Sequence, residues 1–208
     1  MKKLLALFAL VSVVLACSLI GKKGKNGNSN SSSSSSNGAN SVDGEPVERP
    51  NPTAAQSAAI ANGRPVTWDQ QGITWTLPAN WSKNEVRNES FTYSGGAAHM
   101  TVQISVMPEM KDYVETSSKA MYNAAKTQKS IGKYDEVRWL ELDGVRGVGF
   151  RESVQEEPGD IRRLEWQAYR TFAGSTQLIT MILSTDSGEF AKHQDELYGI
   201  LYSTKVTH

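Results

Sequence analysis

The sequence has little of the material from which disulfides and metal centres are built. Its 208 residues contain one cysteine, which excludes an intrachain disulfide and any metal site with several thiolates. Three histidines leave little for a histidine-based site. There is no surplus of positive charge either, because 22 basic side chains balance 22 acidic ones. The sequence therefore lacks the bulk basic field of non-specific nucleic-acid binders, and we expect no nucleic-acid partner.

Familiar catalytic motifs are also absent. The chain has no G-x-S-x-G, no phosphate loop, no G-x-G-x-x-G and no H-E-x-x-H. Glu189 and His193 can share a helical face but supply only two metal ligands, and Glu156–Glu157 beside Pro158 are typical of an exposed turn. We therefore predict no catalytic residue, no cofactor-binding residue and no metal ligand, and no cofactor.

The N-terminus carries the most specific signal in the chain. A basic start, Met1-Lys2-Lys3, precedes an apolar run from Leu4 to Ala16 that is too short to cross a membrane and is typical of a secretory signal. The run ends in Val14-Leu15-Ala16-Cys17, which resembles the lipobox of bacterial lipoproteins. The resemblance implies cleavage before Cys17 and lipid attachment to its sulfur. An ordinary signal peptide with a free cysteine is the alternative.

Residues 18–63 contain no aromatic side chain and are rich in serine, asparagine, glycine and proline. Such a composition cannot bury enough apolar surface to offset the entropy of ordering the chain. The sequence therefore predicts a signal peptide over 1–16, a lipidated disordered linker over 17–63 and a single domain over 64–208. Within the linker, the alanine-rich stretch 53–62 favours a short helix.

The domain is predicted to begin with strands. Trp68, Ile73, Trp75 and Leu77 mark the buried faces of an opening hairpin, and strands are expected at 90–93 and 99–107. A helix over 109–129 is expected to present one apolar face, which consists of Tyr113, Val114, Ser117, Ala120, Met121, Ala124 and Ala125. We predict that most of the five tryptophans are core residues, with Trp81 the best candidate for exposure.

The clearest signal in the domain is the Asp143-Gly144 pair, which favours a type I′ hairpin turn. With these residues at the tip, Trp139 faces Val148, and an ion pair between Glu141 and Arg146 is expected. Gly147 and Gly149 leave two empty positions on one face, over which another part of the chain can sit. Strands at 164–172 and 177–183 and a helix at 187–202 follow, and Asp186 and Glu189 are spaced as a capping box.

The opening Gly72-Ile73-Thr74-Trp75-Thr76-Leu77-Pro78-Ala79-Asn80-Trp81, together with this element order, resembles the Mog1/PsbP-like group. The resemblance implies an α+β fold: a mainly antiparallel β-sheet with helices packed on both faces, preceded by the tether. It also implies non-enzymatic binding or accessory roles. It transfers no functional residues, because no matching motif is present.

These observations predict a protein of the bacterial cell envelope, anchored to membrane lipid through acylated Cys17 on the periplasmic or extracellular face. The favoured function is a non-enzymatic binding or accessory module for an envelope protein or peptide. A small-ligand or lipid carrier and an envelope hydrolase are the alternatives. An exposed apolar patch on a sheet face favours the module, a closed apolar cavity favours a carrier, and a deep polar pocket favours an enzyme.

Overall fold

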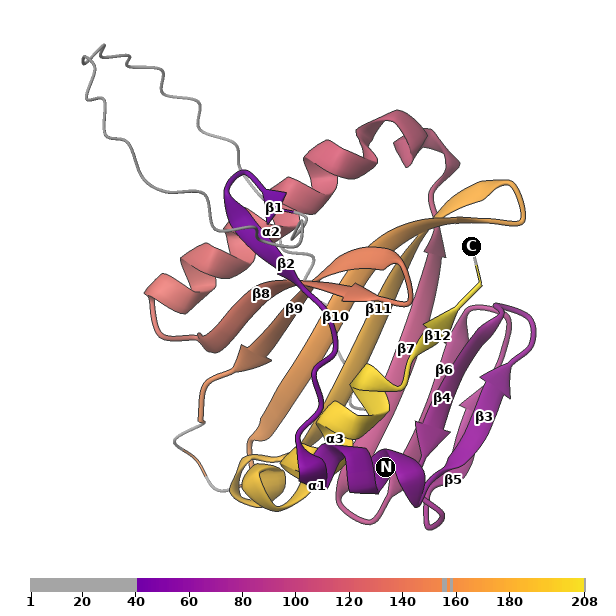
Figure 1. The fold of residues 1–208 in the computed structure, drawn as a ribbon, viewed down its shortest axis with the longest axis vertical. Coiled ribbons are helices and arrows are strands. Elements are labelled where there is room, and N and C mark those ends of the chain that lie inside the picture. The colour runs from indigo at the N-terminus through magenta and orange to yellow at the C-terminus, as the bar shows by residue number, and fades with distance from the viewer. Residues whose placement is uncertain (1–40, 155–156, 158, 208) are drawn as a thin grey trace, which may run out of the picture. The chain divides into compact units, whose positions relative to one another are not determined.

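The structure, a computed structural model, describes residues 41–154, 157 and 159–207 (Figure 1). The predicted signal peptide, Cys17 and the first part of the linker lie outside these residues. No helix in the described ranges is both long and apolar enough to cross a membrane.

The described chain contains a sheet of nine strands in the order β1-β2-β8-β9-β10-β11-β7-β6-β5 and a second sheet in the order β12-β4-β3. Every strand pair is antiparallel except β2 with β8. The predicted α+β class with a mainly antiparallel sheet is therefore confirmed. The strands are β1 (Ser41–Val42), β2 (Glu45–Glu48), β3 (Arg64–Trp68), β4 (Ile73–Leu77), β5 (Ser82–Val86), β6 (Ser90–Gly95), β7 (Ala98–Val106), β8 (Tyr134–Leu142), β9 (Val145–Glu152), β10 (Ile161–Phe172), β11 (Ser175–Asp186) and β12 (Lys205–Val206).

The helices pack on both faces of the large sheet. They are α1 (Ala54–Ala61), α2 (Val114–Ser130) and α3 (Phe190–Tyr202), with short 3₁₀ turns at Pro108–Tyr113 and Ser187–Glu189. Side chains alternate along β8, so Trp139 packs with Tyr122 of α2 while the next residue, Leu140, packs in the cluster that holds Leu197 of α3. Helix α1 lies beside α3 (Figure 1), where a Cβ on Gly199 would be only 3.3 Å from that of Ala59.

The hairpin of β8 and β9 has the predicted turn and register. Asp143 and Gly144 both have positive φ, 49° and 85°, in the left-handed region that a type I′ turn requires. Trp139 pairs with Val148 as expected. The indole of Trp166 occupies the space over Gly147 and donates from Nε1 to the Leu140 carbonyl at 3.0 Å. The predicted ion pair of the turn is wrong, because Glu141 pairs with Arg49 and Arg146 pairs with Glu115.

Several boundaries differ from the sequence prediction. Residues 41–63 include β1, β2 and α1, so the predicted disordered linker does not hold for this stretch. The stretch is ordered by tertiary contacts that its composition does not reveal: Val42 is buried against α2, and β2 pairs with β8. The predicted short helix is confirmed as α1, whose capping box joins Thr53 to Gln56. Strand β5 was not predicted.

Three side-chain predictions are corrected by packing. Trp81 is 1% exposed, because its indole lies over Gly95 and donates to the Glu196 carboxylate at 2.5 Å. Helix α2 buries Ser118, Tyr122 and Ala125, a stripe rotated from the predicted one. The capping box at Asp186 does not form, since that residue makes no side-chain cap hydrogen bond.

Candidate functional site

The two faces of the large sheet are covered unequally in the described part of the chain. One face is packed against α3 and against the small sheet. There the ring centroids of Trp75 in β4 and Phe91 in β6 are 4.7 Å apart. On the other face, α2 packs on β8 and β9 through Tyr122, Trp139 and Phe150. We call the outward residues of β10, β11 and β7 on this second face the open sheet face; they are half-buried or exposed and mostly polar, for example Gln167, Thr180 and Gln103.

Three of the exposed large apolar residues lie at one end of this face. Ile131 is 65% exposed, Val154 is 69% exposed and Ile161 is 47% exposed. Ile131 follows α2, Val154 follows β9, and Ile161 is the first residue of β10. Because β8, β9 and β10 pair antiparallel, these three positions lie at the same end of the sheet. Ile161 lies on the outward side, because its neighbour Arg162 is buried on the α3 side over Phe190, 4.5 Å from the ring centre. We call Ile131, Val154 and Ile161 the Ile161 patch.

Charged groups adjoin the Ile161 patch. Arg163 donates from Nη1 to the two carboxylate oxygens of Glu152 at 3.0 and 3.2 Å, and its backbone N–H donates to the same carboxylate at 2.9 Å. Arg162 and Arg163 thus lie on opposite faces, as predicted. Burial, and secondarily the charge of Glu152, raises the pKa of Glu165 from the ordinary 4.5 to about 7. Near neutral pH the Glu165 carboxyl can therefore either donate or accept a hydrogen bond.

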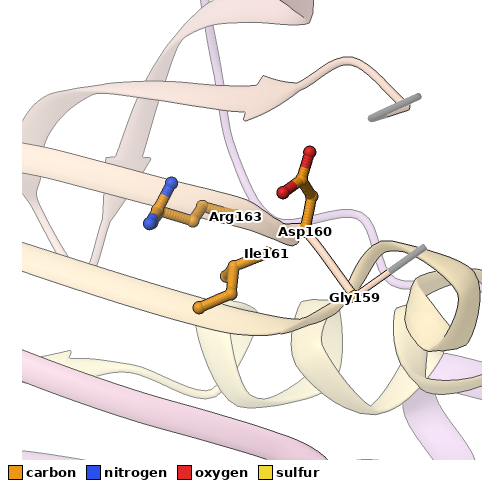
Figure 2. Close-up of a pocket in the computed structure, with 4 residues that line it drawn as sticks. All are labelled: Gly159, Asp160, Ile161 and Arg163. Atoms are coloured by element: carbon orange, nitrogen blue, oxygen red, sulfur yellow. The ribbon is translucent and has the colours of Figure 1, made fainter. Parts of the chain in front are cut away.

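A shallow hollow borders the same end of the sheet. It is lined by Gly159, Asp160, Ile161 and Arg163, holds about 430 Å³ and opens widely to solvent. Figure 2 shows the carboxylate of Asp160 and the guanidinium of Arg163 extending in different directions, so they do not converge on one point. An open hollow without converging polar groups suits contact with a protein surface better than enclosure of a small molecule.

The charged side chains on the α3 side of β8 and β9 form ion pairs and hydrogen bonds with one another. Tyr198 donates its hydroxyl proton to Glu136 at 2.5 Å and accepts from Arg151 Nη1 at 3.1 Å, while Arg138 donates to the Tyr202 hydroxyl at 2.8 Å. Burial first, and then the charge of Glu136, raises the pKa of Tyr198. These hydrogen bonds join α3 to β8 and β9, and each charged group in them has a partner within the network.

The residues weighed as metal ligands are dispersed. Glu189 pairs with Lys192 at 2.9 Å, and His193 Nδ1 is 3.9 Å from the carboxylate of Glu196, which receives the Trp81 hydrogen bond. Within the described ranges, no three histidine, cysteine or acidic side chains form a group that could hold a metal ion. The predicted lipid-attachment residue, Cys17, lies outside these ranges.

Sequence reasoning missed Glu165 and the Ile161 patch. Alternation along 161–172 was available as a signal and places Ile161 and Glu165 on one face. The sequence does not show that α2 leaves this part of the sheet uncovered, because the position of the helix depends on its packing against β8.

Comparisons with known proteins give similar structures only. No protein-family model matches the sequence, and the search of curated proteins found no match. A crystal structure from Bacteroides thetaiotaomicron is 12% identical with a TM-score of 0.45 over 71% of this chain; the matched part spans 49% of that structure. The solution structure of cyanobacterial PsbP from Synechocystis is 16% identical with a TM-score of 0.45, over 71% of this chain and 94% of that one. LpqN, described as involved in cell envelope biogenesis of Mycobacterium tuberculosis, is 12% identical with a TM-score of 0.43, over 70% and 86%.

Proposed function

We propose that this chain is a lipid-anchored protein of the bacterial cell envelope whose folded domain is a non-enzymatic binding module. The open sheet face, with the Ile161 patch at its end, is the surface that contacts an envelope protein. The observation that carries the proposal is the unequal covering of the sheet. One face is packed by α3 and the small sheet, whereas the part of the other face beyond α2 ends in three exposed aliphatic side chains.

The packing of the interior favours this function over a ligand carrier. A carrier needs a closed apolar space between sheet and helix, and that space here holds large side chains such as Trp166, Met181 and Leu197, each at most 1% exposed. The composition of the open sheet face also fits a protein partner, because interfaces that form and dissociate combine an apolar centre with a polar rim. Arg163 and Glu152 supply such a rim beside Ile161.

Site-specific photo-crosslinking in the native host tests the proposed surface. A photoreactive residue at Ile161 or at Thr180 should give the same adduct, whereas one at Lys83, which is exposed on the edge strand β5, should not. The additional substitution Val154→Glu should lower the adduct from position 161 by about tenfold, because charge replaces an apolar contact in the interface. An adduct that forms equally from position 83, or that is insensitive to Val154→Glu, contradicts the proposal.

The anchor has its own test. Cys17→Ser removes the thiol that would carry the lipid, so palmitate labelling should be lost and the protein should leave the membrane fraction. Ser18→Ala is the matched control and should keep both properties. A Cys17→Ser protein that remains labelled and membrane-bound contradicts the lipoprotein part of the proposal without affecting the binding module.

A further inference from the structure

The segment that leads into the domain is seated in a groove like a bound peptide. Strands β1 and β2 form a hairpin whose turn is Asp43-Gly44. The hairpin lies against α2 and against the edge of β8 (Figure 1), where Val47 pairs with Trp139 and Glu48 with Leu140 in a parallel ladder. We define the α2–β8 groove by the residues that contact this hairpin: Lys119, Tyr122, Asn123, Lys126 and Trp139.

The groove holds the hairpin by apolar contacts and by charge pairs, of which those of Val42, Asp43 and Glu45 lie on α2. Val42 is 5% exposed and packs in the cluster that contains Tyr122 and Trp139. The carboxylate of Asp43 pairs with Lys119 at 2.9 Å, and that of Glu45 pairs with Lys126 at 3.0 Å. The four helical residues of the groove are spaced at 119, 122, 123 and 126, which places them on a single face of α2.

The hairpin is held weakly for a part of the fold. The strand ladder between β2 and β8 covers two residue pairs. The ion pairs of the segment, which also include Glu48 with Arg138 and Arg49 with Glu141, each have one side chain that is at least 47% exposed, and such pairs stabilise little. Pro50 and Pro52 follow β2 and have no N–H to extend the ladder. Val42 supplies the buried contact of β1. A segment held in this way can leave the groove at modest cost.

The hairpin also fills the groove incompletely. A hollow of about 160 Å³ remains between it and α2, lined by the groove residues together with Val42, Asp43 and Glu45. Trp139 is 1% exposed, and its indole Nε1 has no hydrogen-bond acceptor in the described structure. A segment that fills this hollow more completely has an advantage over the chain's own hairpin, because it gains packing contacts that the hairpin lacks.

We propose that the α2–β8 groove is a second recognition site, for an acidic β-hairpin segment of a partner protein, and that residues 41–48 are its exchangeable internal occupant. The seated segment defines the ligand: an apolar residue followed by an acid at the next position and another two positions later. The second strand of the partner hairpin adds to the edge of β8, an apolar side chain of its first strand replaces Val42, and its acidic side chains pair with Lys119 and Lys126. This goes beyond the function proposed above, because it uses a different surface.

The probe is a fluorescein-labelled peptide with the sequence of residues 41–49, added to the full chain purified in detergent. Asp43→Lys/Glu45→Lys reverses the exposed charges that hold the hairpin and should release it without disturbing the core. Since the apparent dissociation constant varies inversely with the open fraction, this variant should bind the peptide at least about tenfold more tightly than the native chain. Glu109→Lys/Asp112→Lys is the matched control: it makes the same charge change at exposed positions before α2 and should bind like the native chain.

Two further measurements separate groove binding from other causes. Lys119→Glu/Lys126→Glu should abolish binding of this peptide, and a peptide whose two acids are lysines should regain binding to that variant. Saturating peptide should increase hydrogen exchange of residues 41–48 in the native chain while α2 stays protected. If the released variant binds no better than the control, or if residues 41–48 stay protected while peptide is bound, the proposal is wrong. It is also wrong if the released variant ignores the peptide and sediments as a dimer, since the occupant is then a second copy of the chain.

Discussion

Gly147→Ala should destabilise the domain strongly. A Cβ at position 147 would lie 2.5 Å from the Gln167 backbone carbonyl oxygen and 2.5 Å from Trp166 Nε1. Neither neighbour can move easily, because Gln167 belongs to the ladder of β10 and Trp166 is fully buried with its indole bonded to Leu140. Overpacking of this kind costs about 1–3 kcal/mol, and loss of the buried hydrogen bond adds about 1 kcal/mol. We therefore expect Gly147→Ala to lower the free energy of unfolding by about 2–4 kcal/mol.

Gly149→Ala is the control, because it makes the same chemical change two residues along on the same face. Its Cβ would meet Leu140 atoms at 3.5 Å, which is ordinary contact. We expect its free energy of unfolding to stay within about 0.5 kcal/mol of the native value. Urea titration followed by far-ultraviolet circular dichroism measures both variants, and the melting temperature of Gly147→Ala should fall by about 5–15 °C. Equal losses in the two variants would refute the assignment of the Gly147 space to Trp166.

Two other predictions concern single charged groups. Glu165→Gln should stabilise the protein by about 1–3 kcal/mol at pH 8 and have little effect at pH 4. The reason is that folding raises the pKa of Glu165 to about 7, so the native protein loses stability as the pH rises from about 4.5 to 7. Urea titrations of both proteins across this range check it, and a difference independent of pH would contradict it. Arg170→Lys should lower the free energy of unfolding by about 1–3 kcal/mol, because a single ammonium cannot reproduce the guanidinium hydrogen bonds to Gln177, Gln71 and the Thr207 carbonyl. Thermal melts of this variant and of Arg87→Lys, a control at an exposed arginine, check the prediction. Equal melting temperatures for the two variants would show that the guanidinium of Arg170 contributes little.

Local patterns were sufficient for many of the elements. The turn at Asp143-Gly144 and the register of β8 with β9 follow from two residues, because a two-residue turn fixes which side chains face one another. The stripe of Phe190, Leu197, Ile200 and Leu201 on α3 follows from helical spacing and is buried as predicted. Burial of the opening hairpin around Trp68 and Trp75 follows from alternation.

Contacts between distant segments were not accessible in this way. Trp81 is buried because Gly95 and Glu196, far from it in sequence, provide space and a hydrogen-bond acceptor. Glu141 pairs with Arg49, which follows β2, and Arg146 pairs with Glu115 of α2, so the two turn residues do not pair with each other. Residues 41–48 have a composition typical of a linker, yet β2 pairs with the edge of β8, and Asp43 and Glu45 pair with two lysines of α2.

The sequence by itself determined the balance of charge, the scarcity of metal-binding side chains, the order of most strands and helices and the register of the central hairpin. These properties depend on composition or on residues close together in the chain, where spacing alone sets geometry. Only the tertiary structure decided which sheet face is left open by the described residues, how Glu165 comes to have a raised pKa and where residues 41–48 are seated. Each of these depends on packing among side chains from distant parts of the chain.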